Sequence, residues 1–221
     1  MPEPLNPQSP TPNPEEHADY LEAGRLLFAG PVAFELGVAN MAQLPYADVP
    51  EVAFAGRSNV GKSSLVNALT GRNKLARAST EPGRTRELNF FRMGDRLRLV
   101  DLPGYGYAKA AKTDIGRWTG LTNDYLRGRV SLKRVILLID ARHGVKPHDM
   151  DVMDALDKAA VTYQLVFTKA DKEKPTDVAD LKATTQKLIA KRPAAHPEII
   201  ATSAQTGLGI DLLRAEIAAL A

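Results

Sequence analysis

Short apolar segments alternate with longer amphipathic segments along most of the chain, beginning at Glu51. The segment from Val135 to Ile139 is apolar at every position, which is typical of a strand that is buried on both faces of a sheet. This alternation favours the α/β class, with a mostly parallel central sheet and helices on both faces. We expect strands at Glu51–Ala55, Leu88–Met93, Leu97–Leu102, Arg134–Asp140, Thr162–Thr168 and Glu198–Ala201.

The longer segments have the spacing of helices that bury one face. In the last of them, apolar residues recur every three or four positions and form one stripe that can pack on a sheet. The residues of this stripe are Ile210, Leu213, Ile217 and Leu220. We expect helices at Lys62–Leu69, about Thr113–Arg127, Pro147–Lys158, Thr176–Lys191 and Leu208–Leu220.

The part of the chain before the first expected strand has a different character. Six prolines among polar residues favour a disordered tail over residues 1–16. Residues 17–50 are interrupted by Gly30-Pro31 and by later glycine and proline, so we expect an irregular segment packed on the domain. Residues 51–221 would form one domain, because a chain of 221 residues with 44% hydrophobic residues can bury one sizeable core.

Composition narrows the classes of function. The chain has no cysteine, which excludes a disulfide framework and a thiolate metal site. Its apolar runs are far shorter than the ~20 residues that span a bilayer, and no secretory signal is visible, so we expect a soluble protein without a membrane partner. The formal net charge of +3 only leans towards anionic partners at this chain length.

The segment from Gly56 to Ser63 reads G-R-S-N-V-G-K-S and stands where an expected strand ends and an expected helix begins. Backbone N–H groups of such a loop, together with the helix amino terminus, point at phosphate oxygens. Lys62 would add a positive charge at the β and γ phosphates, and the Ser63 hydroxyl is a hard oxygen ligand suited to Mg²⁺. An ordinary glycine-rich turn is the alternative, but the flanking strand and helix favour a P-loop.

A second motif, Asp101-Leu102-Pro103-Gly104, follows the third expected strand. A carboxylate at the carboxyl end of that strand can reach the metal through water, and Gly104 can offer its N–H to the γ phosphate. The alternative is an ordinary exit from a strand into a loop. Together with the P-loop, this motif predicts a nucleoside triphosphate site in a P-loop NTPase fold.

The base would be recognised by Thr168-Lys169-Ala170-Asp171, at the end of another expected strand. The Asp171 carboxylate can accept hydrogen bonds from the ring N–H and the exocyclic amine of guanine, whereas adenine offers no matching pair of donors. The stem of Lys169 would lie along the base, and Thr202-Ser203-Ala204 would present N–H groups to the guanine carbonyl. Alone the motif is more often a solvated loop, but in this order it predicts GTP and GDP as ligands.

Two loops are candidates for movement. The polar stretch from Gly71 to Arg86 is long for a connection inside a compact domain, which favours a functional or disordered segment. Within it, the Thr85 hydroxyl could complete the coordination of Mg²⁺ only while the γ phosphate is present; a solvated threonine is the alternative. A second loop, from Leu102 to about Thr113, would respond to the same phosphate. We therefore expect a GTPase with a conformational switch.

The position that holds a catalytic glutamine in many GTPases, immediately after D-x-x-G, is Tyr105 here. We therefore expect slow intrinsic hydrolysis, roughly 10⁻⁴ to 10⁻² per second. Asn59 inside the P-loop is a candidate helper, because its side-chain oxygen could coordinate a potassium ion (K⁺) beside the phosphates. Asparagine also suits turns, so a turn-stabilising role is the alternative.

These motifs give a set of candidate site residues. The candidate catalytic residues are Lys62, Thr85 and Asn59, and the candidate Mg²⁺ ligands are Ser63 and Thr85. The candidate nucleotide-binding residues are Gly56, Arg57, Ser58, Asn59, Val60, Gly61, Lys62, Ser63, Ser64, Gly83, Arg84, Thr85, Arg86, Glu87, Asp101, Leu102, Pro103, Gly104, Thr168, Lys169, Ala170, Asp171, Thr202, Ser203 and Ala204.

Several motifs occur together in an order that resembles one known family. They are Gly56–Ser64, Pro82–Thr85 before Asn89-Phe90-Phe91, Asp101–Tyr107, Thr168–Asp171, and Asp140–Gly144 with Asp149 and Met153 downstream. In this combination, over about residues 25–221, the chain resembles the EngB (YihA/YsxC) GTPases. The combination is much more specific than any one motif.

The resemblance implies a bacterial, cytoplasmic GTPase that assists assembly of the large ribosomal subunit, with Ser63 and Thr85 as Mg²⁺ ligands. The family also lacks a glutamine after D-x-x-G, so Tyr105 is no departure from it. Basic residues that flank the two loops could contact phosphates of ribosomal RNA, alongside ribosomal proteins, or form an ordinary solvated face. We expect a monomer.

Two other hypotheses remain. One is a nucleotide-sensing module whose main partner is a protein, such as a regulator of division or stress, with hydrolysis only resetting it. The other is a G domain of a tRNA-modifying enzyme, which fits Asn59 but leaves no room for a modifying domain. Dependence of binding on RNA and on the bound nucleotide separates the first from ribosome assembly.

Overall fold

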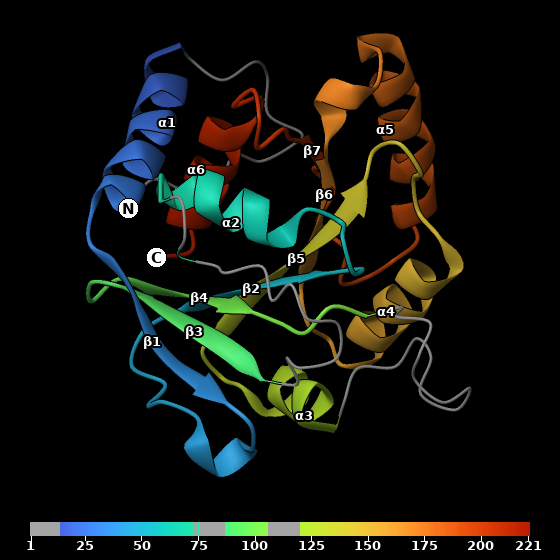
Figure 1. The fold of residues 1–221 in the computed structure, drawn as a ribbon. Coiled ribbons are helices and arrows are strands. Elements are labelled where there is room, and N and C mark those ends of the chain that lie inside the picture. The colour runs from blue at the N-terminus through green and yellow to red at the C-terminus, as the bar shows by residue number, and fades with distance from the viewer. Residues whose placement is uncertain (1–13, 73–74, 76–86, 106–119) are drawn as a thin grey trace.

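The computed structural model describes residues 14–72, 75, 87–105 and 120–221. Its strands form one mixed sheet (Figure 1). Their order across the sheet is β1-β3-β4-β2-β5-β6-β7. Neighbouring strands from β4 to β7 run parallel, whereas β3 pairs antiparallel with both β1 and β4. The expected mostly parallel α/β fold is thereby confirmed. The strands are β1 (Val32–Val38), β2 (Glu51–Gly56), β3 (Leu88–Met93), β4 (Leu97–Asp101), β5 (Leu132–Asp140), β6 (Tyr163–Thr168) and β7 (Ile200–Ala201).

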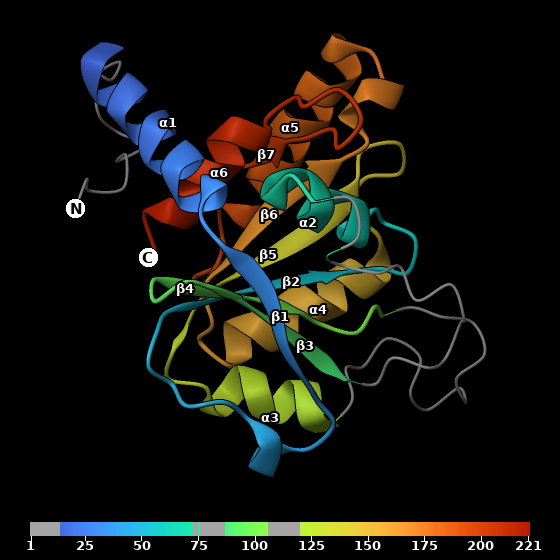
Figure 2. The same cartoon turned by 60° about the vertical axis from the view of Figure 1, so that its left-hand side comes forward.

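Helices cover both faces of the sheet, because successive residues of a fully buried strand point to opposite sides. Val52 and Phe54 of β2 pack in the cluster that includes α1, α2 and α6. Ala53 and Ala55 pack on the other side, with α3, α4 and α5 (Figures 1 and 2). None of the helices described combines the length and apolarity needed to cross a bilayer. The helices are α1 (Pro14–Ala29), α2 (Lys62–Thr70), α3 (Gly120–Gly128), α4 (Pro147–Lys158), α5 (Pro175–Ile189) and α6 (Ile210–Ala218).

Most expected elements lie where the sequence placed them, and their ends shift for local reasons. The bounds of β3 and α4 are as expected. Helix α6 begins two positions later than expected, because Gly209 at its N-cap adopts a left-handed φ of 67°. Helix α5 begins at Pro175, whose fixed φ suits the first turn of a helix. The expected start of α3 at Thr113 lies outside the described residues.

The expectation of an irregular segment over residues 17–50 is wrong. Helix α1 and edge strand β1 occupy much of it. Gly30-Pro31 lies between these two regular elements, so it marks a boundary and not an irregular region. Residues 14–16, which we placed in the tail, form the first turn of α1, while residues 1–13 lie outside the described part. The sequence did not indicate this strand, because the buried and exposed residues of β1 do not alternate regularly and its pairing with β3 contains an irregularity.

Helix α1 packs against α6, so the first and last helices of the described chain lie side by side (Figure 2). Leu27 and Phe28 of α1 are buried in the same cluster as Leu213 of α6. The two backbones approach closely at Gly24, where an added β-carbon would lie 2.5 Å from the backbone nitrogen of Ala215. Only glycine fits this approach, which fixes how α1 sits on the domain.

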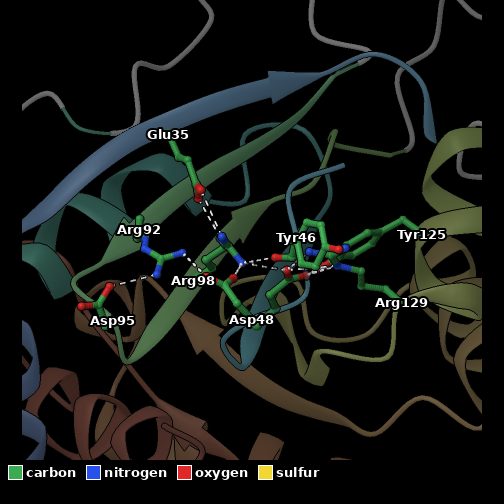
Figure 3. Close-up of polar contacts among 9 residues, drawn as sticks. Glu35, Tyr46, Asp48, Arg92, Asp95, Arg98, Tyr125 and Arg129 are labelled. Carbon is green, nitrogen blue, oxygen red and sulfur yellow. Dashed lines mark hydrogen bonds and ion pairs between the residues drawn. The ribbon is translucent and has the colours of Figure 1, made fainter. Parts of the chain in front are cut away.

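A buried polar network joins β1, β2, β4 and α3 (Figure 3). The Arg98 guanidinium of β4 is only 2% exposed and donates to Glu35 at 2.7 Å and to Asp48 at 2.6 Å. The carboxylate of Glu51, which is fully buried at the start of β2, accepts from the Tyr125 hydroxyl at 2.9 Å and from Arg129 Nε at 2.9 Å. Each buried charge therefore has a partner of opposite sign, as burial in an apolar surrounding requires.

Candidate functional site

The P-loop connects the carboxyl end of β2 to the amino terminus of α2. Two of its residues have left-handed backbone conformations: Asn59 with a φ of 64° and Gly61 with a φ of 104°. These conformations turn the chain back over the start of α2, whose first N–H groups have no acceptor within the helix. A loop of this shape before a helix amino terminus is the kind that binds phosphate, so the role predicted from the sequence stays a prediction that the backbone geometry suits.

Lys62 and Asp101 are in direct contact although they stand far apart in the chain. The Lys62 ammonium is ion-paired with the Asp101 carboxylate, and the two side chains are 13% and 12% exposed. The contact arises because β2 and β4 are parallel neighbours, with Phe54 paired to Asp101. The structure thus brings the predicted phosphate-binding lysine and the predicted metal-side carboxylate together at one end of the sheet.

The D-x-x-G segment runs beside the P-loop and hydrogen-bonds to it. Tyr105 N–H donates to the Gly56 carbonyl at 3.2 Å, and Ser58 N–H donates to the Tyr105 carbonyl at 3.1 Å. Gly104 lies against Ser58, since an added β-carbon at Gly104 would come within 3.3 Å of the serine Oγ. The two motifs that we expected to flank a γ phosphate are therefore adjacent.

The side chain of Tyr105 is buried in the core, 4% exposed. Its hydroxyl donates to Asp149 Oδ1 at 2.9 Å, and Asp149 Oδ2 accepts from the Lys146 N–H at 2.8 Å at the start of α4. Burial raises the pKa of the Tyr105 hydroxyl, and the Asp149 carboxylate beside it raises it further. Burial also raises the pKa of Asp149. The side chain at the position of the catalytic glutamine is thus held in the core by its hydrogen bond to Asp149.

The motif expected to bind the base lies at the adjoining ends of β6 and β7. A hydrogen bond with Ser203, and then the neighbouring Lys172, lower the pKa of Asp171. The ion pair between Lys172 Nζ and Asp171 Oδ2 measures 3.1 Å. Ala170 N–H donates to the Thr202 carbonyl at 3.0 Å. The structure therefore brings the two separately predicted segments together around an ionised carboxylate.

A cavity of about 600 Å³ extends from the P-loop to this carboxylate. Its volume falls within the usual range for small-molecule sites, roughly 300–1,000 Å³. Seven of its thirteen described lining residues are predicted nucleotide-binding residues, and the others come from α2 and its C-cap, from the segment after β6 and from the segment after β7. The predicted residues in the lining are Gly61, Ser64, Thr168, Lys169, Asp171, Thr202 and Ala204.

The base motif also contacts the P-loop directly. Lys169 Nζ donates to the Asn59 carbonyl at 2.8 Å, and Thr168 Oγ1 donates to the Val60 carbonyl at 2.6 Å. These two contacts tie consecutive carbonyls of the P-loop to the end of β6. The segments predicted to bind the phosphates and the base are therefore directly connected.

Part of the predicted site is not covered by the structure. Gly83, Arg84, Thr85 and Arg86 lie outside the described residues, so the role of Thr85 stays a prediction. Glu87 is exposed beside β1, with its carboxylate near Gly37. Sequence reasoning gave no role to Asp140, Arg142, Asp149 or Lys172, although the first three stand in a motif of the family resemblance. Only the fold shows what they contact.

Comparison with known proteins gives a consistent result. Residues 51–169 match the model of a family described as 50S ribosome-binding GTPases. The chain is 58% identical over 212 residues to a probable GTP-binding protein EngB of Rhodospirillum rubrum, covering 94% of this chain and 92% of that protein. The crystal structure of a probable GTP-binding protein engB aligns with a TM-score of 0.60 and 24% identity, covering 77% of this chain and 98% of that one. Era in complex with MgGDPNP and nucleotides of 16S ribosomal RNA aligns with a TM-score of 0.58 and 26% identity, covering 78% of this chain and 57% of Era.

Proposed function

The chain belongs to the EngB family of GTP-binding proteins and is a GTPase, and from this membership we propose that its GTP cycle assists assembly of the large ribosomal subunit. The observation that carries the proposal is the match to 50S ribosome-binding GTPases over residues 51–169, which include the P-loop and the D-x-x-G segment. The likeness to Era, whose solved complex contains a GTP analogue and ribosomal RNA, supports a ribosomal partner. The cytoplasm of a bacterium, where ribosome precursors are assembled, is the proposed place of action.

We assign the nucleotide to the cavity between the P-loop and Asp171. The base contacts Asp171, and the phosphates lie over the P-loop and the amino terminus of α2. In this arrangement a phosphate takes the place of Asp101 beside the Lys62 ammonium. Nucleotide binding therefore exchanges an ion pair within the protein for one with the ligand.

The residues around Lys62 fit a Mg²⁺ ion. Ser63 follows Lys62 in α2 and Asp101 is ion-paired with Lys62, and the two supply hydroxyl and carboxylate oxygens, the hard ligands that this ion prefers. We propose that Ser63 and Thr85 hold the metal directly and that Asp101 holds it through water. When bound, Mg²⁺ neutralises negative charge on the phosphates. Thr85 makes its contact only in the GTP state, which supplies the switch.

Hydrolysis in this site needs help, because Tyr105 is anchored to Asp149. We propose that Asn59 binds K⁺ beside the phosphates. GTP turnover is then expected to be at least about tenfold faster in potassium than in sodium at equal ionic strength, because one added positive group at the transition state has an effect of that order or larger. Phosphate release from the purified protein measures it, and Asn59→Ala should abolish the difference. Equal turnover in the two salts contradicts the role of K⁺.

The ribosomal role predicts nucleotide-dependent binding. Purified large subunits should co-sediment with the protein when a non-hydrolysable GTP analogue is bound, and at least about tenfold less protein should sediment with GDP, because GDP lacks the γ phosphate to which the switch responds. Binding should weaken steeply between two salt concentrations, as expected for contacts with RNA phosphates.

Small subunits serve as the control for this experiment, since the RNA in the Era complex is 16S ribosomal RNA. Equal sedimentation with GDP and with the analogue argues against control of ribosome binding by the bound nucleotide. Absence of binding to large subunits in both states favours the second candidate, a nucleotide-sensing module that acts on a protein partner. We expect a monomer in either case.

A further inference from the structure

Asp140 ends β5 at the edge of the nucleotide site, where it is paired in register with Thr168 of β6. The carboxylate belongs to the segment Asp140–Gly144, to which the proposed function gives no role. The residue is only 9% exposed, so its charge needs partners. The partners of this carboxylate indicate its role in the site.

Two cations hold the Asp140 carboxylate. Arg142 donates from Nε to Oδ1 at 2.9 Å and from Nη2 to Oδ2 at 2.7 Å, and Lys169 Nζ donates to Oδ2 at 2.9 Å. Burial by itself raises the pKa of Asp140, but these hydrogen bonds outweigh it and hold the pKa well below its ordinary value. The group is therefore a fixed negative charge beside the Lys169 ammonium.

Lys169 in turn contacts the P-loop in a constrained conformation. Its φ of 58° is left-handed, which is uncommon for a residue with a long side chain. Its stem passes Gly61, where an added β-carbon would lie 3.6 Å from the lysine Cε, and its ammonium donates to the Asn59 carbonyl at 2.8 Å. One ammonium is thus shared between Asp140 and a loop carbonyl.

We infer that Asp140 is a positioning residue for nucleotide binding, which fixes the Lys169 side chain between the base site and the P-loop before the nucleotide arrives. Without the carboxylate, the ammonium keeps a single neutral acceptor and the stem is free to leave the cavity. Lys169 must then be ordered when the nucleotide binds, and the conformational entropy lost in that step weakens nucleotide binding. This inference rests on the proposed placement of the nucleotide at Asp171 and the P-loop.

The variant Asp140→Asn keeps the shape of the side chain and removes its charge. We expect it to raise the Kd for GDP and for a non-hydrolysable GTP analogue by the same factor, about tenfold, which is the size of one charge-assisted hydrogen bond. The factors should be equal because both ligands share the base and the first two phosphates. At saturating GTP the kcat should stay within about twofold of that of the unchanged protein, because the γ phosphate side is untouched.

A double-mutant cycle with Lys169→Met separates positioning from a general structural effect. If Asp140 acts through Lys169, Asp140→Asn should cost affinity in the unchanged protein and almost none when Lys169 is methionine. Asp154→Asn is the matched control, because this carboxylate of α4 is 55% exposed and pairs with Arg192. It should leave the affinity for GDP unchanged.

The outcomes distinguish this inference from the proposed site. The inference is overturned if Asp140→Asn leaves the affinity for GDP unchanged, or if its effect is the same with lysine and with methionine at position 169, while Asp171→Asn still lowers GTP affinity by about 10³-fold or more. If Asp171→Asn and Lys169→Met both leave GTP binding intact, the placement of the nucleotide itself is wrong. Isothermal titration calorimetry with the full chain measures the Kd for GDP and for the GTP analogue in each of these variants.

Discussion

Replacement of Asp171 by asparagine is expected to lower the affinity for GTP by about 10³-fold or more and to make xanthosine triphosphate the preferred ligand. The Asp171 carboxylate is held ionised by the hydrogen bond with Ser203 and by Lys172, so at neutral pH it only accepts hydrogen bonds. Guanine offers two donors to it. An asparagine amide instead offers donors, which suit the extra carbonyl of xanthine, and unpaired groups of this kind change specificity by up to about 10⁴- to 10⁵-fold.

Titration of the purified variant with GTP and with xanthosine triphosphate measures both changes. Asp177→Asn provides the control, because Asp177 is an exposed carboxylate in the first turn of α5, a few residues further along the chain. It should bind GTP like the unchanged protein. An Asp171→Asn variant that keeps its GTP affinity would remove this residue from base recognition.

Replacement of Glu51 by alanine is expected to lower the free energy of unfolding by about 3–5 kcal/mol, the usual effect of removing one member of a buried ion pair. Glu51 is fully buried, and its loss removes the carboxylate that pairs with Arg129 and the acceptor of the Tyr125 hydroxyl. Arg98 keeps Glu35 and Asp48, so the damage should centre on the contact between α3 and β2.

Urea denaturation at a fixed GDP concentration measures the effect, since bound nucleotide adds its own stabilisation. Asp95→Asn is the matched control, because its carboxylate is 98% exposed and pairs with Arg92, which also binds Asp48 of the network. Exposed pairs contribute about 0–1 kcal/mol, so this variant should unfold close to the unchanged protein. If Glu51→Ala behaves like Asp95→Asn, the buried network does not hold α3 on the sheet.

The sequence predicted the parts of the molecule that depend on local patterns. The P-loop is recognised from glycines, a lysine and a serine at fixed spacing between an apolar run and a helix. The continuously apolar run from Val135 to Ile139 lies within β5, which has neighbours on both edges and helices on both faces. Such features are set by residues near one another in the chain, so a single sequence is enough to find them.

The features that escaped prediction depend on contacts between distant segments. Nothing near Tyr105 indicates that its hydroxyl meets Asp149, because the partner stands 44 positions away. In the same way, Lys169 meets Asp140 across 29 positions only because β5 and β6 are parallel neighbours. Helix α1 and strand β1 were missed for a related reason, since their stability comes from α6 and β3 and not from a strong pattern of their own.

The packing of α1 on α6 has a consequence for how the chain is made. Synthesis proceeds from the amino terminus, so Leu27 and Phe28 leave the ribosome long before Leu213, beside which they are buried. The P-loop and the sheet around it can form earlier, whereas α1 must wait for the last helix described. A nascent chain stopped before Ile210 would therefore carry every nucleotide-binding motif and still expose the apolar face of its first helix.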